Sequence, residues 1–354
     1  MIKLGIIGSN YGRMVLLPAF RADPRCEVIA LAGSNAARTA DLAKEAGVPK
    51  AYGDWRALVD DKDVQAIVIA TLPSLQSEIA VAALKAGRPV FAEKPMAGDL
   101  AAAHAMLAAA KQSGLPTGID FNFTRIMAWL RAKEMLDAGV VGTLRHVTVH
   151  WHVESRAIQM RMRNWKTAGG NDGGGVIGNF VSHCFHYLEW FVGPIAGLQA
   201  RVSGMPDDAD LQTTAAMALQ YKSGPQVSLS MSCASYAGIG HRIEFFGEDG
   251  TLVLHNPTAD YMRGFALTHA KRPGLMQHIA VEDPFDAQYP DGRIAPVSRL
   301  ANKFFDAIET GKQTAPDFAA GYRVQRLIDA AHRSHRHGQW IDFAAEGAFR
   351  SDKE

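Results

Sequence analysis

The chain has 354 residues, of which 47% are hydrophobic and 21% charged, an ordinary composition for a globular protein with a large core. Its 37 Lys and Arg residues balance 36 Asp and Glu residues, so no basic surplus indicates nucleic acid or an anionic membrane as a partner. The apolar runs are too short to span a bilayer, no secretory leader is evident, and Cys26, Cys184 and Cys233 have no paired spacing. We therefore expect a cytoplasmic protein of two domains without disulfides.

The first part of the chain alternates short apolar runs with helical patterns. Strands are expected at residues 3–8, 26–33, 64–71, 88–95 and 116–121, and helices at residues 12–23, 35–47, 75–87 and 99–114. Continuous apolar strands that alternate with helices form parallel sheets covered on both faces. We therefore predict an α/β fold in which residues 1–121 form a doubly wound Rossmann domain.

A glycine-containing turn, Gly8-Ser9-Asn10-Tyr11-Gly12, links the first expected strand to the first helix. In this position backbone N–H groups and the helix dipole hold the pyrophosphate of a dinucleotide. The G-x-G-x-x-G fingerprint is incomplete, because Asn10 holds the place of the second glycine. Asn tolerates positive φ better than most residues, so we expect Asn10 to replace that glycine in the turn. The alternative is a strand–helix turn without a ligand.

The end of the second expected strand bears on the choice of dinucleotide. NAD-binding proteins usually carry a carboxylate there for the ribose 2′-hydroxyl, whereas this chain has Ser34 and, further on, Arg38. A hydroxyl and a guanidinium suit a 2′-phosphate, so the sequence favours NADP, with NAD as the alternative. The opposing interpretation is that Arg38 is a solvated helix residue and Ser34 caps its helix.

Glu93-Lys94-Pro95 ends the fourth strand, at the sheet edge where ligands bind in such folds. A partly desolvated lysine there can take part in proton transfer, and the proline allows a cis bond. On its own the tripeptide is a weak signal, because most such lysines lie on the surface.

Beyond residue 121 the pattern changes to alternation. Half-exposed strands are expected at residues 143–155, 213–221, 226–233 and 241–256, the last with a hairpin turn at Glu248-Asp249-Gly250, and helices at Thr124–Asp137, Gly175–Phe191, Ser298–Thr310 and Phe318–His335. Residues 122–354 are therefore expected to form an α/β domain with a large, open, mostly antiparallel sheet. Its last helix is expected to pack back on the Rossmann domain.

The helix that follows a glycine-rich run carries Asn179, His183 and His186. Asn179 and His183 are four residues apart and share a face, and a histidine facing a cofactor can accept the proton of an alcohol that loses hydride. The alternative is a core histidine bonded to a backbone carbonyl. We expect no metal at His183 and His186, because no carboxylate completes a ligand set.

Together these stretches resemble the Gfo/Idh/MocA family of NAD(P)-dependent oxidoreductases, related to glucose–fructose oxidoreductase and inositol dehydrogenase, over nearly the whole chain. The stretches that carry the resemblance are GSNYGRMVLLPAF, IVIATLPSLQSEIAVAALKAGRPVFAEKPMA, GGGVIGNFVSHCFHYLEWFVG and the closing FAAGYRVQRLIDAAHRSHRHGQWIDF. The resemblance implies a Rossmann domain, a sheet domain that often forms homodimer or homotetramer contacts, and a polyol or sugar substrate held between them.

The resemblance also assigns roles to residues. It makes Lys94 and His183 the catalytic pair, with Asn179 beside them in place of the usual aspartate; His186 replaces a second aspartate and Gln76 a frequent histidine. It implies a substrate pocket lined by Asn122, Arg125, Trp165 and Lys166. It implies cofactor contacts from Gly8, Ser9, Asn10, Tyr11, Gly12, Ser34, Arg38, Thr71, Leu72, Pro73, Gln76, Glu93, Lys94 and Pro95.

The expected activity is hydride transfer between a nicotinamide and a secondary alcohol or ketone of a sugar, a sugar derivative or a cyclitol. Two other functions remain open at this point. One is a hydrolase or lyase that keeps its cofactor bound, as some relatives of the family are glycosidases of that kind. The other is a regulator that binds NADP without catalysis.

Overall fold

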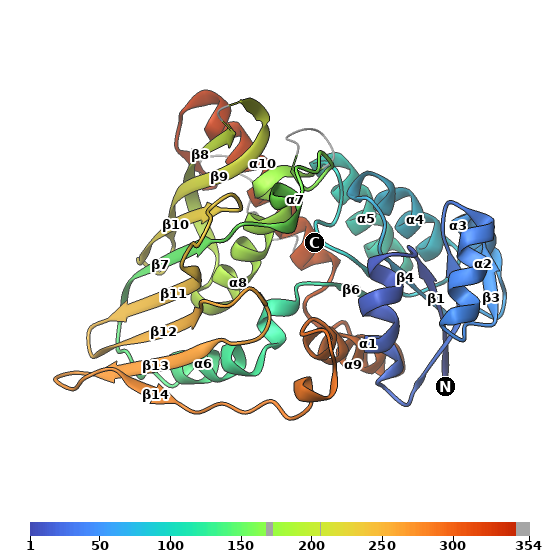
Figure 1. Cartoon of the computed structure of the whole chain (residues 1–354), viewed down its shortest axis with the longest axis horizontal. Coiled ribbons are helices and arrows are strands. Elements are labelled where there is room, and N and C mark those ends of the chain that lie inside the picture. Colours follow the sequence, from blue (N-terminus) through green and yellow to red (C-terminus); the bar gives the residue numbers. More distant parts are fainter. Residues whose placement is uncertain (168–172, 206, 345–354) are drawn as a thin grey trace. The chain divides into compact units, whose positions relative to one another are not determined.

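The computed structural model describes residues 1–167, 173–205 and 207–344, which fall into two compact units (Figure 1). Met1–Arg125, Gly173 and Pro284–Gln325 form the first unit, and the other described residues form the second. The first continuous segment thus ends close to the expected boundary at residue 121. Residues 284–325, which the sequence assigned to the second domain, belong to the first unit.

The first unit contains a six-stranded parallel sheet in the order β3-β2-β1-β4-β5-β6. Its strands are β1 (Ile2–Ile7), β2 (Cys26–Ala32), β3 (Lys50–Tyr52), β4 (Ala66–Ile69), β5 (Val90–Ala92) and β6 (Thr117–Ile119). This is the strand order of a dinucleotide-binding sheet, so the predicted doubly wound Rossmann fold is confirmed. Strand β3 was not predicted, because three residues at a sheet edge, two half-exposed and one exposed, give no periodic signal.

Helices accompany the strands of this unit. They are η1 (Gly12–Leu16), α1 (Leu17–Arg21), α2 (Ala36–Glu45), α3 (Trp55–Asp60), α4 (Pro73–Lys85), α5 (Leu100–Ser113), η2 (Asn122–Arg125), η4 (Asp286–Gln288), α9 (Ile294–Thr310) and the first part of α10 (Phe318–His337). The last two come from the far end of the sequence. The main-chain N–H of Phe318, at the start of α10, donates to Thr117 Oγ1 of β6 at 3.2 Å.

Aromatic packing fixes α9 in the first unit. The Phe20 ring of α1 makes edge-on contacts with Phe91, Phe304 and Phe305, with centroid separations of 5.2, 6.4 and 5.6 Å. All four rings are almost completely buried, and burial of each contributes about 1.5–3 kcal/mol. The apolar stripe of α9 therefore completes the core of a sheet that begins at residue 2.

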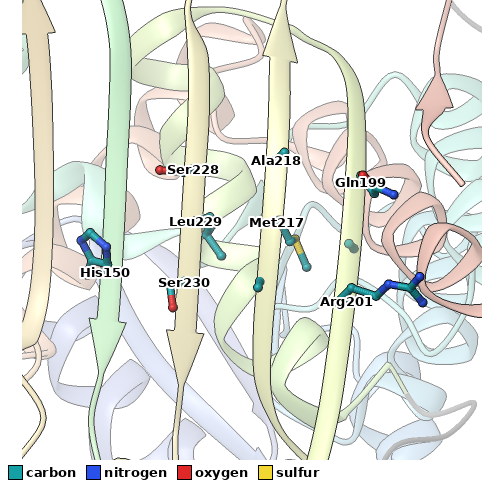
Figure 2. Close-up of a pocket in the computed structure, with 10 residues that line it drawn as sticks. His150, Gln199, Arg201, Met217, Ala218, Ser228, Leu229 and Ser230 are labelled. Atoms are coloured by element: carbon teal, nitrogen blue, oxygen red, sulfur yellow. The ribbon is translucent and has the colours of Figure 1, made fainter. Parts of the chain in front are cut away.

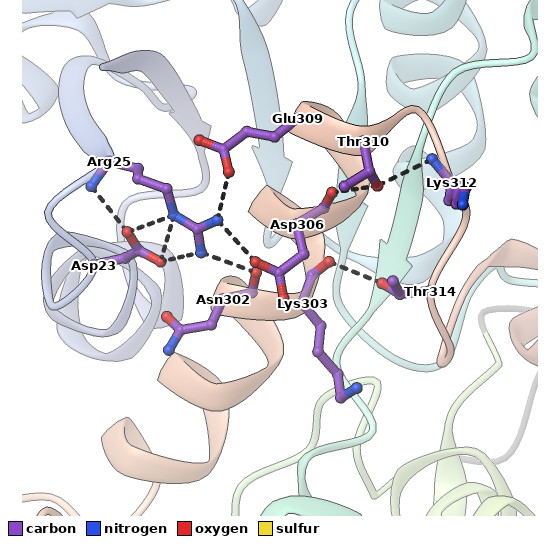
Figure 3. A network of polar contacts seen from close by, with 9 residues as sticks. All are labelled: Asp23, Arg25, Asn302, Lys303, Asp306, Glu309, Thr310, Lys312 and Thr314. Atoms are coloured by element: carbon purple, nitrogen blue, oxygen red, sulfur yellow. Dashed lines mark hydrogen bonds and ion pairs between the residues drawn. The ribbon is translucent and has the colours of Figure 1, made fainter.

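A polar network lies at the edge of the contact between α9 and the rest of the first unit (Figure 3). The Arg25 guanidinium lies 2.7 Å from the Asp23 carboxylate and 2.8 Å from the carboxylates of Asp306 and Glu309 on α9. Asp23 is only 4% exposed, whereas the two α9 carboxylates are more than half exposed. We therefore expect most of the energy of this network to reside in the Arg25–Asp23 pair.

The second unit contains a nine-stranded sheet in the order β14-β13-β12-β11-β7-β10-β9-β8-β15, in which only β7 and β10 pair in parallel. Its strands are β7 (Leu144–His152), β8 (Ile195–Met205), β9 (Asp208–Tyr221), β10 (Gln226–Ser232), β11 (Gly240–Gly247), β12 (Gly250–Asn256), β13 (Ala266–Lys271), β14 (Gln277–Ile279) and β15 (Ile341–Asp342). The predicted large, mostly antiparallel sheet is confirmed, including its β11–β12 hairpin. Strand β8 was not predicted, because Gly197 and Gly204 interrupt its alternation.

The second unit also contains helices. They are α6 (Met127–Asp137), α7 (Arg156–Gln159), η3 (Ile177–Val181), α8 (Ser182–Val192) and the later part of α10. The Trp129 ring of α6 lies 4.9 Å from Tyr187 of α8 and 5.6 Å from His241 of β11, measured between centroids. One face of β9 presents small exposed side chains such as Ala216 and Ala218.

No helix among the described residues has the length and apolar character that a membrane span requires. No three His, Cys, Asp or Glu side chains in the same ranges gather as metal ligands would. The thiols of all three cysteines are free.

Candidate cofactor and active site

The residues predicted to bind the cofactor lie at the carboxyl ends of the strands of the first unit. Gly8–Gly12 follow β1, Ser34 and Arg38 follow β2, Thr71–Pro73 follow β4, and Glu93–Pro95 follow β5. Because all six strands are parallel, these ends share one edge of the sheet, and ligands of such folds bind at that edge. The parallel arrangement of the strands thus brings together residues that lie up to 87 positions apart in the sequence.

The turn after β1 requires glycine at its first position. Gly8 has φ +126°, and a Cβ atom there would lie 2.3 Å from the carbonyl oxygen of Ala70 at the end of β4. No side chain caps the N-terminal end of η1, so first-turn N–H groups can face an anion. A turn without obstructing side chains that leads into the uncapped N-terminal end of a helix fits a pyrophosphate.

Asn10 was expected to replace a glycine by taking a positive φ, and that expectation was wrong, whereas its contact with the cofactor stays a prediction. Among the described non-glycine residues, positive φ occurs at Arg161 and Ala237, and not at Asn10. Asn10 is exposed, and its carbonyl oxygen accepts from the N–H of Met14 at 2.9 Å. In this turn Gly8, and not Asn10, takes the conformation that only glycine adopts readily.

At the end of β2, Ser34 and Arg38 are both exposed. The cap of α2 is Asn35, whose side-chain oxygen accepts from the Arg38 N–H at 3.0 Å, so Ser34 is not the cap. Within the described ranges no carboxylate pairs with the Arg38 guanidinium. A Cβ atom on Gly33 would lie 3.3 Å from Ser9 Oγ, so this turn adjoins the one after β1.

The Gln76 side chain is hydrogen-bonded to the backbone of the Glu93-Lys94-Pro95 turn. The Lys94–Pro95 bond is cis. The Gln76 side chain is fully buried, and its Nε2 donates to the carbonyl oxygens of Glu93 at 3.0 Å and Pro95 at 2.8 Å. Gln76 was predicted as a cofactor contact; the structure places its amide against the backbone of the turn that carries Lys94.

A buried acidic pair lies beside Lys94. The Lys94 N–H donates to Glu93 Oε2 at 3.0 Å, and the Tyr11 hydroxyl donates to Asp120 Oδ2 at 3.1 Å. Burial raises the pKa of both carboxyls, and the charge of Asp120 raises the pKa of Glu93 further. Sequence reasoning did not single out Asp120, although an acidic residue directly after a buried strand beside the lysine strand was an available signal.

The two residues of η2 predicted to bind substrate differ in their surroundings. Asn122 is buried, and no described group donates to its Oδ1. Arg125 donates from Nη2 to the carbonyl oxygen of Ala315 at 3.2 Å, and its own carbonyl accepts from Arg299 at 2.9 Å. Burial lowers the pKa of Arg125.

The remaining predicted residues belong to the second unit. His183 is 7% exposed on α8 beside Trp151, with ring centroids 6.4 Å apart, and Asn179 is half-buried on η3. Lys166 Nζ lies 5.7 Å from the centre of the Trp165 ring, and the Trp165 carbonyl accepts from Gly175 N–H at 3.1 Å. The structure therefore ties the Trp165–Lys166 segment to the start of the helix that carries Asn179 and His183.

A second buried histidine of this unit shows what a purely structural histidine looks like. His241 stacks on Trp151 at 4.2 Å and pairs with the Tyr187 hydroxyl at 3.0 Å. Complete burial lowers its pKa to about 3, so it stays neutral throughout the physiological range. The pairing of Lys94 in the first unit with His183 in the second stays a prediction.

Comparisons with known proteins agree with this arrangement. Residues 2–121 match the Gfo/Idh/MocA family model described as "Oxidoreductase family, NAD-binding Rossmann fold", and residues 129–253 match the model of a C-terminal domain of the same family. An uncharacterized oxidoreductase, sll0816, of Synechocystis sp. is 30% identical, over 96% of this chain and 95% of its own. Levoglucosan dehydrogenase of Pseudarthrobacter phenanthrenivorans is 25% identical over 88% of both chains. A solved levoglucosan dehydrogenase in complex with NADH and levoglucosan shares the fold, with a TM-score of 0.87, 22% identity and coverage of 96% and 99%.

Proposed function

The chain belongs to the Gfo/Idh/MocA family of NAD(P)-dependent oxidoreductases, and from this premise we propose that it acts on CH–OH groups of small polyols. The reaction is hydride transfer between the nicotinamide and a secondary alcohol or ketone of a sugar, a sugar derivative or a cyclitol. The observation that carries the proposal is the Lys94 turn, held by the buried Gln76 amide at the same sheet edge as the Gly8 turn. The name of the relative that acts on levoglucosan supports a sugar-like substrate.

The residues of this chain hold the cofactor and handle the proton. The Gly8 turn receives the pyrophosphate, and Thr71, Leu72 and Pro73 lie along the same edge. When bound, the nicotinamide supplies the acceptor or donor of hydride. In the oxidative direction, the His183 imidazole is the proposed acceptor of the hydroxyl proton, and the Lys94 side chain is the proposed hydrogen-bond donor to the substrate. Asn179 can bond a hydroxyl but cannot take a net proton.

The cofactor we propose is NADP, with NAD as the alternative. Ser34 and the guanidinium of Arg38 provide a hydroxyl and a positive charge at the end of β2, and residues 33–38 contain no carboxylate for a ribose 2′-hydroxyl. The names of solved relatives mention NADH and NAD⁺, so NAD remains the alternative cofactor. Cofactor choice is decided by direct titration.

We also propose that the enzyme is a cytoplasmic homodimer or homotetramer assembled through the face of the nine-stranded sheet that carries the exposed Ala216 and Ala218. A hollow of about 440 Å³ lies on this sheet, lined by residues of β7, β8, β9 and β10 (Figure 2). Small side chains, Ala216, Ala218, Ser228 and Ser230, alternate there with the buried core positions, which leaves the surface hollowed between His150 and Arg201. Light scattering of the wild type and of Ala218→Arg tests this, because a bulky charge on the face disrupts an assembly and leaves a monomer unaffected.

The experiment that tests the catalytic proposal is a paired titration of NADP and NAD, followed by turnover with a panel of polyols and keto-sugars. We expect one cofactor to be reduced by at least one polyol, and Lys94→Ala to lose turnover while it keeps cofactor affinity. Turnover without net change in reduced nicotinamide indicates a hydrolase or lyase. Cofactor binding without any turnover, unaffected by Lys94→Ala, indicates a regulator; either result overturns the proposal.

A further inference from the structure

Two neighbouring strand ends bring two carboxyl groups together in the first unit. Ala92 of β5 pairs with Ile119 of β6, so the next residues, Glu93 and Asp120, lie at equivalent positions of adjacent parallel strands. Asp120 is 1% exposed, and the Oε1 atom of Glu93 is buried. Two ionised carboxylates in such a place would repel strongly, because little water screens them.

Each carboxyl has one oxygen that is already bonded. Glu93 Oε2 accepts from the Lys94 N–H, and Asp120 Oδ2 accepts from the Tyr11 hydroxyl. The other oxygens, Glu93 Oε1 and Asp120 Oδ1, are buried, and no described N–H or O–H donates to them. The two carboxyl groups nevertheless lie within electrostatic and hydrogen-bonding reach of each other. Since carboxylate oxygens only accept, a hydrogen bond between them requires a proton held by one of the two groups.

We propose that Glu93 and Asp120 share one proton at neutral pH and act together as a single negative charge that positions Lys94 and the Tyr11 turn. This inference deepens the proposed function, since it concerns the surroundings of the lysine assigned to proton transfer there. Burial raises the pKa of both carboxyls, and the charge of Asp120 raises the pKa of Glu93 further, so the pair favours retention of one proton.

The charged and titratable groups that face the pair come from three elements. Lys94 on the same turn favours the ionised form of both carboxyls. Tyr11, at the start of η1, bonds Asp120, and Arg293, at the start of α9, lies over the Tyr11 ring at 5.4 Å and also favours the ionised form of Asp120. Loss of the shared proton at alkaline pH places a second negative charge between these groups. We therefore expect that ionisation to change how Lys94 and Tyr11 are held.

Infrared spectroscopy tests the shared proton directly, since a protonated carboxyl has a C=O band separate from those of carboxylates. We expect that band at neutral pH in the wild type and its loss in Asp120→Asn, because the asparagine amide donates to Glu93, which then ionises. Glu93→Gln loses the band for the same reason and serves as a second variant if Asp120→Asn does not fold. Asp23→Asn is the matched control: Asp23 is also buried but is ionised beside Arg25, so its replacement leaves the band unchanged.

The pH dependence of turnover tests the positioning role. Loss of the shared proton contributes an alkaline limb to kcat/KM in the wild type, and Asp120→Asn, which has no such proton, shifts that limb to higher pH. Absence of the band in the wild type, or its persistence in Asp120→Asn, overturns the shared proton. An unchanged alkaline limb in Asp120→Asn overturns the positioning role. Because the infrared result does not depend on turnover, failure of the proposed oxidoreductase activity is distinguishable from failure of this inference.

Discussion

The side-chain nitrogen of Gln76, on α4, lies 2.8 Å from the carbonyl oxygen of Pro95 and donates a hydrogen bond to it. The same nitrogen donates to the carbonyl of Glu93, so one buried amide bonds the carbonyl oxygens of the residues on both sides of Lys94. Its role is mechanical: it fixes the backbone from which the Lys94 side chain projects.

Replacement of Gln76 by Ala is therefore expected to lower the free energy of unfolding by about 1–3 kcal/mol, because it leaves buried carbonyl oxygens without a donor. Urea unfolding measures this change. Gln112→Ala, at an exposed position of α5, is the control and is expected to change stability by less than about 0.5 kcal/mol. Equal stability of Gln76→Ala and the wild type would contradict the mechanical role.

Gly8 and Asn10 form a matched pair in the turn after β1. Gly8→Val is expected to abolish cofactor binding, because a Cβ atom would meet the Ala70 carbonyl and because φ +126° is strained for any side chain. Asn10→Gly is expected to keep most affinity, since Asn10 has no positive φ to preserve. Fluorescence titration with NADPH and NADH measures both. Loss of most affinity in Asn10→Gly would mean that the Asn10 side chain itself contacts the cofactor.

Arg38 is expected to discriminate between the two dinucleotides. Arg38→Ala removes a guanidinium that can bond a 2′-phosphate, so the Kd for NADP is expected to rise about ten- to one-hundredfold while that for NAD stays the same. Lys44→Ala, an exposed cation near the other end of α2, is the control for a general charge effect. A parallel rise for both cofactors, or none, would remove the argument for NADP.

His183 is expected to contribute to kcat and little to cofactor affinity. His183→Asn removes the base but keeps a hydrogen-bonding side chain of similar length, so kcat is expected to fall about 10²–10⁴-fold. His186→Asn, three residues further along α8, is the matched control. If the two substitutions reduced kcat equally, His183 would be a structural histidine like His241.

The Arg25–Asp23 pair predicts how stability depends on pH. Burial by itself would raise the pKa of Asp23, but hydrogen bonds from Arg25 and its charge hold that pKa below the ordinary 3.8. The stabilisation is therefore complete above pH 3.8 and is lost as the pH falls through the lower native value. Arg25→Met is expected to cost about 2 kcal/mol at neutral pH, less than for a fully buried pair.

Urea unfolding of the wild type and of Arg25→Met, at neutral pH and below pH 3.8, checks this prediction. The difference between the two proteins should shrink in acid, since Asp23 protonates in both. Glu309→Gln, whose carboxylate is 52% exposed, is the control and should change stability by less than about 1 kcal/mol. A difference independent of pH would show that lost packing of Arg25 on Phe305, and not the ion pair, explains the cost.

The sequence by itself determined the fold class, five of the six strands of the parallel sheet and the edge at which the cofactor residues gather. Apolar runs such as Ala66–Ile69 are buried on both faces, and the spacing of apolar residues is a local property of the chain. The same reasoning located the Gly8 turn and Lys94, because a strand that ends in glycine or a charged residue places it at the carboxyl edge in any parallel sheet.

Only the tertiary structure decided which residues support that edge. The roles of Gln76 and Asp120 depend on hydrogen bonds to Pro95 and Tyr11, 19 and 109 positions away. Similarly, the aromatic contacts of α9 with Phe20 assign residues 294–310 to the first unit, although they follow the strands of the second in sequence. Contacts between distant residues leave no periodic signal in a single sequence, and the φ of Asn10, which the sequence predicted wrongly, is set by how its turn closes against the neighbouring strands.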